Sequence, residues 1–135
     1  MTMRIRPVLA VSAGLAALTL ALAPAASARG NYLPYASKTK LSNGNLFTEI
    51  TPQYDGTGYW RMDEWYEKTG GGTITQQLGF NYHGYSYAKG WITQTSGTSR
   101  MQNFTDLGFT DCSDVVGWMQ VDGQGTFYNA PVGIC

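Results

Sequence analysis

The feature that most constrains the fold of this chain is a series of short segments in which apolar and polar residues alternate, separated by glycine-rich turns. In the clearest of them, Thr73–Tyr82, one face carries Ile74, Leu78 and Phe80. No window of a dozen residues combines a 3.6-residue apolar period with good helix formers. The pattern predicts an all-β domain, a small antiparallel β-sandwich or barrel of six to seven strands. The expected strands are Leu46–Thr51, Tyr59–Lys68, Thr73–Tyr82, Tyr85–Thr95, Ser99–Leu107, Val115–Val121 and Thr126–Val132.

The first 28 residues differ in composition from the rest and predict a secretory signal peptide. Arg4 and Arg6 supply positive charge, and Val8–Leu22 is almost wholly apolar. The sequence Ala26-Ser27-Ala28 then offers the small residues that a signal peptidase requires. The apolar run is shorter than the roughly 20 residues that span a bilayer. We therefore expect a secreted, extracellular protein with one mature β domain, residues 29–135, and the Ala- and Leu-rich signal favours a bacterial source.

The charge of the expected mature domain bears on its partners. Once Arg4 and Arg6 are removed with the signal, seven basic and nine acidic residues remain, a net charge of −2. A slightly acidic domain without a Lys/Arg cluster lacks the charge that binds nucleic-acid phosphates or anionic lipids. We therefore expect no nucleic-acid partner and, after signal removal, no membrane partner. The segment Tyr32–Lys40 shows no period and is expected to form an irregular N-terminal arm.

The two cysteines, Cys112 and Cys135, are expected to form a disulfide. Export would place them in an oxidising compartment, and the bond would stabilise the fold by roughly 3 kcal/mol. Metal ligation is a poorer interpretation, because His83 is the only histidine and no Cys-x-x-Cys motif occurs. We expect neither a metal nor a cofactor.

The candidate binding site depends on an expected hairpin between Tyr59–Lys68 and Thr73–Tyr82. Pairing Lys68 with Ile74 brings the apolar faces of both strands to the same side, although it also points Glu64 inward. The opposite face then carries aromatic rings beside planar hydrogen-bonding groups, and further aromatic residues follow the hairpin. The candidate ligand-binding residues are Tyr59, Arg61, Asp63, Trp65, Gln77, Asn81, His83 and Trp91.

These residue types favour a non-catalytic domain that binds carbohydrate or cell-wall polysaccharide. Aromatic rings stack on the C–H face of a sugar, and carboxylate, amide and guanidinium groups bind its hydroxyls. Ordinary packing is the alternative for each ring, because aromatic residues also pair across strands for structural reasons.

Two other functions stay open. One is a protein inhibitor of an extracellular hydrolase, a protease or an amylase, with that extracellular protein as its partner. Gly58–Arg61 resembles the Trp-Arg tip of proteinaceous α-amylase inhibitors over two residues, but those inhibitors carry two disulfides and this chain can form one. The other is a small secreted ribonuclease with Glu64 as base, His83 as acid and Arg100 for the phosphate. No Gly-x-Ser-x-Gly elbow occurs, so an enzyme is the less favoured interpretation.

Overall fold

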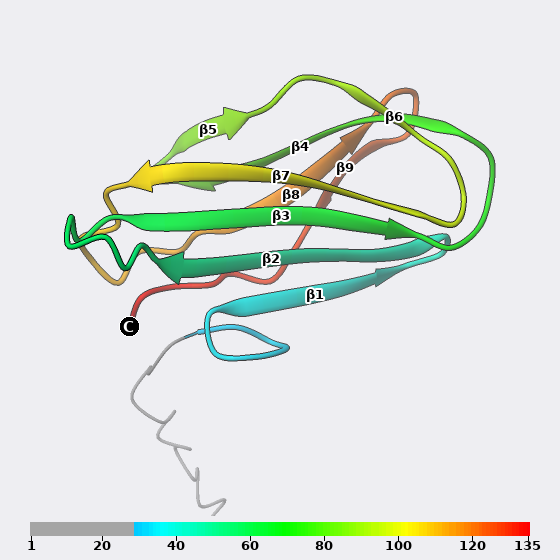
Figure 1. The fold of residues 1–135 in the computed structure, drawn as a ribbon. Coiled ribbons are helices and arrows are strands. Elements are labelled where there is room, and N and C mark those ends of the chain that lie inside the picture. Colours follow the sequence, from blue (N-terminus) through cyan, green and yellow to red (C-terminus); the bar gives the residue numbers. More distant parts are fainter. Residues whose placement is uncertain (1–28) are drawn as a thin grey trace, which may run out of the picture.

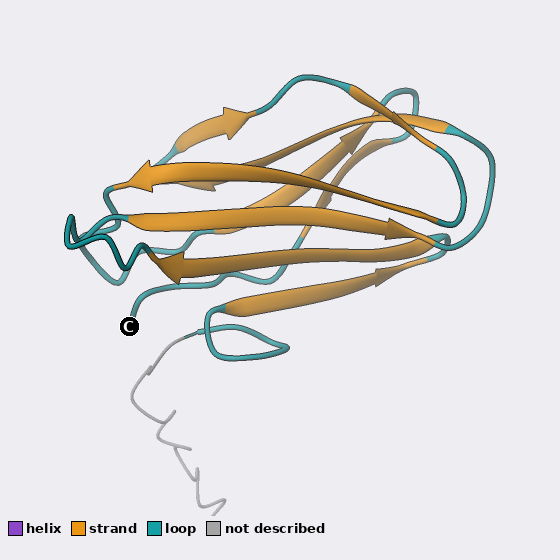
Figure 2. Cartoon of the chain, viewed as in Figure 1, coloured by secondary structure: helices purple, strands orange, loops and turns teal. Residues whose placement is uncertain are grey.

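The computed structural model describes residues 29–135, which form two antiparallel β-sheets packed face to face (Figures 1 and 2). The expected signal peptide lies outside these residues. No helix occurs in residues 29–135, and so none in this part is long and apolar enough to cross a membrane. The strands are β1 (Ala36–Leu41), β2 (Gly44–Pro52), β3 (Trp60–Lys68), β4 (Ile74–Tyr82), β5 (Tyr85–Ala88), β6 (Ile92–Gln94), β7 (Thr98–Leu107), β8 (Val116–Val121) and β9 (Gly125–Tyr128).

The strand order defines a first and a second sheet. The first sheet runs β1-β2-β3-β7. The second runs β5-β4-β8-β9. Along the same edge of β4, β5 pairs with residues 79–82 and β6 pairs with residues 74–76. Neither sheet closes on itself, so of the two architectures that the sequence predicted, the structure is the antiparallel β-sandwich.

Within residues 29–135 nine strands form where six or seven were expected, for two local reasons. The expected strand Tyr85–Thr95 is divided into β5 and β6, because the chain leaves the edge of β4 around Gly90. The expected irregular arm is wrong in its second half, since Ala36–Leu41 forms β1 along β2. This strand shows no apolar period because the small residues Ala36 and Ser37 fill its buried positions.

The expected hairpin between Tyr59–Lys68 and Thr73–Tyr82 is also wrong. β3 pairs with β2 and β7, whereas β4 pairs with β5, β6 and β8, so the two strands lie in different sheets. The predicted inward faces are nevertheless correct, and Met62, Glu64 and Leu78 are all buried. Alternation decides which side chains of each strand face the core. It does not decide whether the two strands are neighbours in one sheet or lie in two sheets that face each other.

The interior holds two apolar clusters. Ile50 on β2 and Met62 on β3 belong to the first, which extends toward the C-terminus of the chain. Leu46 on β2 and Tyr66 on β3 belong to the second, near the β1–β2 turn. The inward position between the clusters on β2 is occupied by a polar residue, Thr48, which is fully buried.

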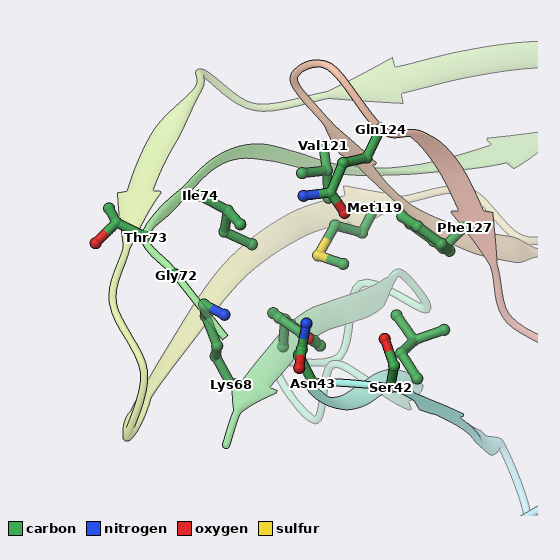
Figure 3. A pocket seen from close by; sticks show the side chains of 12 residues that line it. Ser42, Asn43, Lys68, Gly72, Thr73, Ile74, Met119, Val121, Gln124 and Phe127 are labelled. Atoms are coloured by element: carbon green, nitrogen blue, oxygen red, sulfur yellow. The ribbon is translucent and has the colours of Figure 1, made fainter. Parts of the chain in front are cut away.

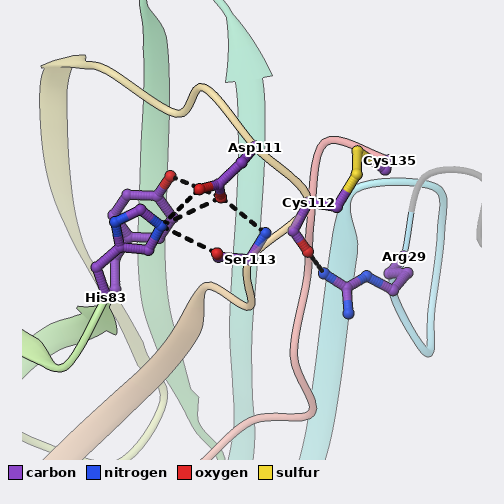
Figure 4. Close-up of polar contacts among 7 residues, drawn as sticks. Arg29, His83, Asp111, Cys112, Ser113 and Cys135 are labelled. Atoms are coloured by element: carbon purple, nitrogen blue, oxygen red, sulfur yellow. Dashed lines mark hydrogen bonds and ion pairs between the residues drawn. A yellow bond between two sulfur atoms is a disulfide. The ribbon is translucent and has the colours of Figure 1, made fainter.

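The expected disulfide is confirmed. Cys112 and Cys135 are bonded, with their Cα atoms 5.1 Å apart and 23 positions apart in sequence. The bond ties the last residue to the loop before β8, and Arg29 donates a hydrogen bond to the carbonyl of Cys112 (Figure 4). Arg29 also donates a hydrogen bond to Asp114. Both ends of the described chain are therefore fixed at the same end of the sandwich.

Candidate functional site

The structure divides the predicted binding residues between opposite faces of the sandwich. Arg61, Asp63 and Trp65 lie on the outer face of the first sheet. Gln77 and Asn81 lie on the outer face of the second sheet. The thickness of the sandwich separates the two groups (Figure 1), so they cannot bind one sugar ring together.

The other three predicted residues lie in connections between strands. Tyr59 precedes β3 and is 45% exposed, and Trp91 lies between β5 and β6 and is 47% exposed. His83 lies in the turn between β4 and β5. The prediction that several aromatic rings are displayed to water holds for Tyr59 and Trp91, whereas Trp65 is half-buried.

The outer face of the first sheet is charged, and its aromatic rings pack against each other. Trp65 stacks on Phe47, with ring centroids 4.7 Å apart and planes 4° apart, and Lys38 Nζ lies 5.3 Å from the centre of the Phe47 ring. Arg61 forms an ion pair with Asp63 at 2.9 Å. One face of the Trp65 ring is thus already covered, and the charged side chains give this sheet an ordinary solvated surface.

The outer face of the second sheet carries no charged side chain from any strand among the described residues. Exposed protein surfaces normally use charged residues for solubility, so a whole uncharged sheet face needs a reason. Amide and hydroxyl groups surround two aromatic rings on this face. Its residues are Thr75, Gln77, Gly79, Asn81, Ser86, Ala88, Thr93, Val116, Trp118, Gln120, Thr126 and Tyr128.

Trp118 and Tyr128 are direct cross-strand partners on this face. Trp118 covers Gly79, where an added Cβ would lie 2.4 Å from its Cζ2 atom, and its Nε1 donates a hydrogen bond to Asn81 Oδ1 at 3.0 Å. Trp118 is 7% exposed, whereas Tyr128 is 56% exposed. The two rings form part of a shallow groove of about 280 Å³ that is also lined by Ser86, Ala88, Gln120 and Thr126.

Sequence reasoning missed both Trp118 and Tyr128, although one signal for Trp118 was present. Gly79 stands inside the most regular strand of the sequence, and a glycine in a strand interior often marks the close approach of another group. That group is the Trp118 indole. The strand that supplies it could not be identified from the sequence, because the pairing of β4 with β8 joins segments about forty residues apart.

His83 forms an exposed polar cluster beside the disulfide (Figure 4). Its Nε2 lies 2.9 Å from Ser113 Oγ and 2.9 Å from Asp111 Oδ2. Hydrogen bonds from the Ser113 side chain and backbone, and then from His83, hold the pKa of Asp111 below its usual range. In a catalytic triad the serine and the aspartate bind different ring nitrogens. Here both bind Nε2, so the cluster is not arranged as a triad and instead joins the β4–β5 turn to the loop before β8.

The residues proposed for a ribonuclease do not come together. Glu64 is fully buried between the sheets, His83 lies in an exposed turn, and Arg100 is exposed on β7. The Trp-Arg pair proposed for an inhibitor is not a loop tip either, because Trp60 begins β3 and packs against Tyr35, with ring centroids 5.6 Å apart. Within residues 29–135 no group of three or more His, Cys, Asp or Glu side chains is placed to hold a metal ion.

A second hollow, of about 170 Å³, lies at the end of the sandwich near the β1–β2 turn (Figure 3). Lys68 is one of the residues that line this hollow, and the ammonium group of Lys68 donates a hydrogen bond to the carbonyl of Gly70. Half of its lining residues are apolar side chains of the second core cluster, so the hollow is an opening into the core rather than a sugar site. These apolar residues are Leu41, Tyr66, Ile74, Met119, Val121 and Phe127.

The fold and surface define a small disulfide-bonded antiparallel β-sandwich with one charged and one uncharged outer face. Neither a family model, nor a curated protein, nor a solved structure matches the chain.

Proposed function

We propose that this protein is a secreted, non-catalytic domain that binds a neutral polysaccharide on the outer face of the second sheet. The observation that carries the proposal is the uncharged face on which Trp118 and Tyr128 lie among amide and hydroxyl groups. A sugar offers a C–H face to aromatic rings and hydroxyl groups to neutral hydrogen-bonding side chains. A neutral ligand suits a neutral surface, because binding then removes no charged side chain of that surface from water and so incurs no desolvation penalty for a charge.

The two rings have different roles in this proposal. Trp118 is almost completely covered, so it forms the floor of the groove and supports the sheet at Gly79. Tyr128 is the ring with a free surface, and it stacks on the sugar. Asn81 Oδ1 already accepts hydrogen bonds from Trp118 and Ser86, whereas no side-chain hydrogen bond within residues 29–135 occupies Gln120 or Thr126. Gln120 and Thr126 are therefore the groups that bind sugar hydroxyls.

Secretion is part of the same proposal. The signal-like first 28 residues and the Cys112–Cys135 disulfide are both compatible with an extracellular protein, and extracellular matrices and cell walls are rich in polysaccharide. No contact in the described part of the chain favours inhibition of a hydrolase over this function.

Retention of the purified protein on insoluble cellulose, chitin and peptidoglycan tests the proposal. We expect retention on at least one of them, and we expect Tyr128→Ala to weaken it roughly tenfold, the effect of losing about 1.4 kcal/mol of stacking. Tyr59→Ala is the matched control, because Tyr59 is a comparably exposed tyrosine that directly precedes β3 of the first sheet. Failure to bind any of the three, or loss of binding in Tyr59→Ala with Tyr128→Ala unaffected, would contradict the proposed face.

A further inference from the structure

A polar cluster lies in the interior between the two apolar clusters. It consists of Thr48 on β2, Glu64 on β3 and Asn129 directly after β9. Thr48 Oγ1 donates a hydrogen bond to Glu64 Oε2 at 2.5 Å and accepts one from Asn129 Nδ2 at 2.7 Å. One hydroxyl group therefore lies between a carboxyl group and a carboxamide, in direct contact with both.

The cluster is closed to water, and a glycine makes room for it. Thr48 and Glu64 are fully buried, and Asn129 is 4% exposed. At Gly117 on β8 an added Cβ would lie 1.9 Å from Thr48 Oγ1 and 2.1 Å from Glu64 Oε2. Any other residue at position 117 would occupy the space in which the hydroxyl and the carboxyl meet.

The hydrogen bonds of this cluster are incomplete. Glu64 Oε1 and Asn129 Oδ1 are buried and have no hydrogen-bond partner. Burial raises the pKa of Glu64 well above its usual range, against the opposing effect of the Thr48 hydrogen bond, and so favours the neutral acid. A neutral carboxyl group has one oxygen that can accept a proton and one proton that it can give. Glu64 contacts the Thr48 hydroxyl directly, so it can take the hydroxyl proton on Oε2 and give its own proton from Oε1 to an amide nitrogen that turns toward it.

We propose that Thr48 and Asn129 become joined by an intramolecular ester bond, with Glu64 relaying the protons. The Asn129 amide rotates so that its Cγ faces Thr48, Oγ1 attacks this carbon, and the new C–O bond forms. Glu64 accepts the hydroxyl proton on Oε2 and gives its own carboxyl proton to the amide nitrogen. The C–N bond then breaks, ammonia leaves, and the neutral carboxyl of Glu64 is regenerated, so the reaction needs no other reactant.

Four physical conditions favour this reaction. Once the amide has turned toward the hydroxyl, well-oriented groups of one molecule can react as if at an effective concentration of about 10⁵ M. Ammonia escapes into dilute solution, and exclusion of water from the core protects the ester from hydrolysis. The product also has fewer buried polar groups to satisfy, because the hydroxyl and the NH₂ group are gone and the ester carbonyl can accept the Glu64 proton.

Tryptic digestion of the denatured protein tests the bond directly. Trypsin cleaves after Lys40, Arg61 and Arg100, so Thr48 falls in fragment 41–61 and Asn129 in fragment 101–135. The disulfide does not join these fragments, because both cysteines lie in the second one. By mass spectrometry we expect a single linked species, lighter than the two fragments together by one ammonia. Recovery of two separate fragments at full mass would overturn the proposal.

Two variants identify the atoms involved. Thr48→Val removes the hydroxyl and keeps the shape of the side chain, and Glu64→Gln removes the carboxyl proton, so both should yield separate fragments. Asn43-Gly44 can also lose ammonia by cyclising within the chain, but this reaction does not link fragment 41–61 to another one. A linked species that persists in Thr48→Val would overturn the assignment. If either variant fails to fold, the wild-type digest still decides whether the bond exists.

Discussion

Strand alternation places the carboxyl group of Glu64 in the core, and this burial makes the stability of the protein depend on pH. Because burial raises its pKa in the folded state above the ordinary value of 4.5, the fold favours the protonated form. The contribution of Glu64 to stability is therefore fully present below about pH 4.5 and is lost as the pH rises toward the raised pKa. The two sheets accommodate this residue more easily when its carboxyl is protonated than when it is charged.

The pH dependence of unfolding measures this effect. Above about pH 4.5 we expect the free energy of unfolding of the wild type to fall relative to that of Glu64→Gln, by up to about 1.4 kcal/mol per pH unit. Urea unfolding of both proteins across a pH series gives the two slopes. The slope is the readout, because the substitution also removes the proposed proton relay for the Thr48–Asn129 bond and so changes the absolute stability. Parallel stability curves would show that Glu64 ionises in the folded protein as it does in the unfolded chain.

Gly117 is the second residue whose identity the core dictates. We expect Gly117→Ala to destabilise the protein by about 3 kcal/mol, since the new Cβ overlaps both Thr48 and Glu64. At Gly72 an added Cβ meets no atom within 4 Å, so Gly72→Ala should change stability by no more than about 0.5 kcal/mol. Denaturant unfolding compares the two variants. Similar effects at both positions would mean that the cluster adjusts easily to a side chain at position 117.

At the scale of elements, the C-terminal segment after β9 is held by few backbone contacts and by one covalent bond. Val132 and Val115 exchange backbone hydrogen bonds at 2.8 and 2.9 Å, and Cys135 is bonded to Cys112. The segment carries Asn129 into the core, so its attachment decides whether the buried cluster is complete.

Removal of the disulfide should therefore be costly. We expect the double variant Cys112→Ser, Cys135→Ser to lose about 3 kcal/mol of stability, because its unfolded chain is no longer restricted by the loop between these residues. Urea unfolding with and without a reductant measures the loss, and the wild type under reducing conditions should unfold as the double variant does. A loss well below 1 kcal/mol would show that the remaining contacts already fix the segment.

At the scale of the whole molecule, charge is distributed unequally between the two outer faces. The first sheet carries Lys, Arg, Asp and Glu side chains and the second carries none from its strands within the described residues. Only a ligand held by the second face should bind independently of ionic strength, because salt screens interactions between charges and leaves stacking and neutral hydrogen bonds largely unaffected.

Salt dependence therefore distinguishes the two faces. We expect retention on polysaccharide to be unchanged between about 0.1 and 1 M salt, a range over which the screening length falls from about 10 to about 3 Å. The measurement is retention of the wild-type protein on the same insoluble polysaccharide at both salt concentrations. Binding that is lost at high salt would assign the ligand to the charged face of the first sheet instead.

Much of the fold could be predicted because it depends on residue type and on alternation. The all-β class and the Cys112–Cys135 bond were both predictable, and so was the inward direction of Glu64. Strand β1 was not, because its buried positions hold Ala36 and Ser37 rather than large apolar residues. The candidate site was predicted only in the types of its residues, since Asn81 borders the proposed groove floor while Trp65 lies on the opposite side of the molecule.

By itself the sequence determined which side chains point into the core, because strand geometry turns successive residues to opposite sides whatever their partners are. Only the tertiary structure decided which strands are neighbours. A glycine-rich loop such as 69–73 can either close a hairpin or cross between sheets. The alternation of apolar and polar residues in the strands on either side of the loop is the same in both cases. Pairing of β4 with β8 and of β8 with β9 depends on contacts between segments far apart in the chain. Those contacts place Trp118 and Tyr128 side by side on one surface, and bring Thr48 to Asn129 in the core.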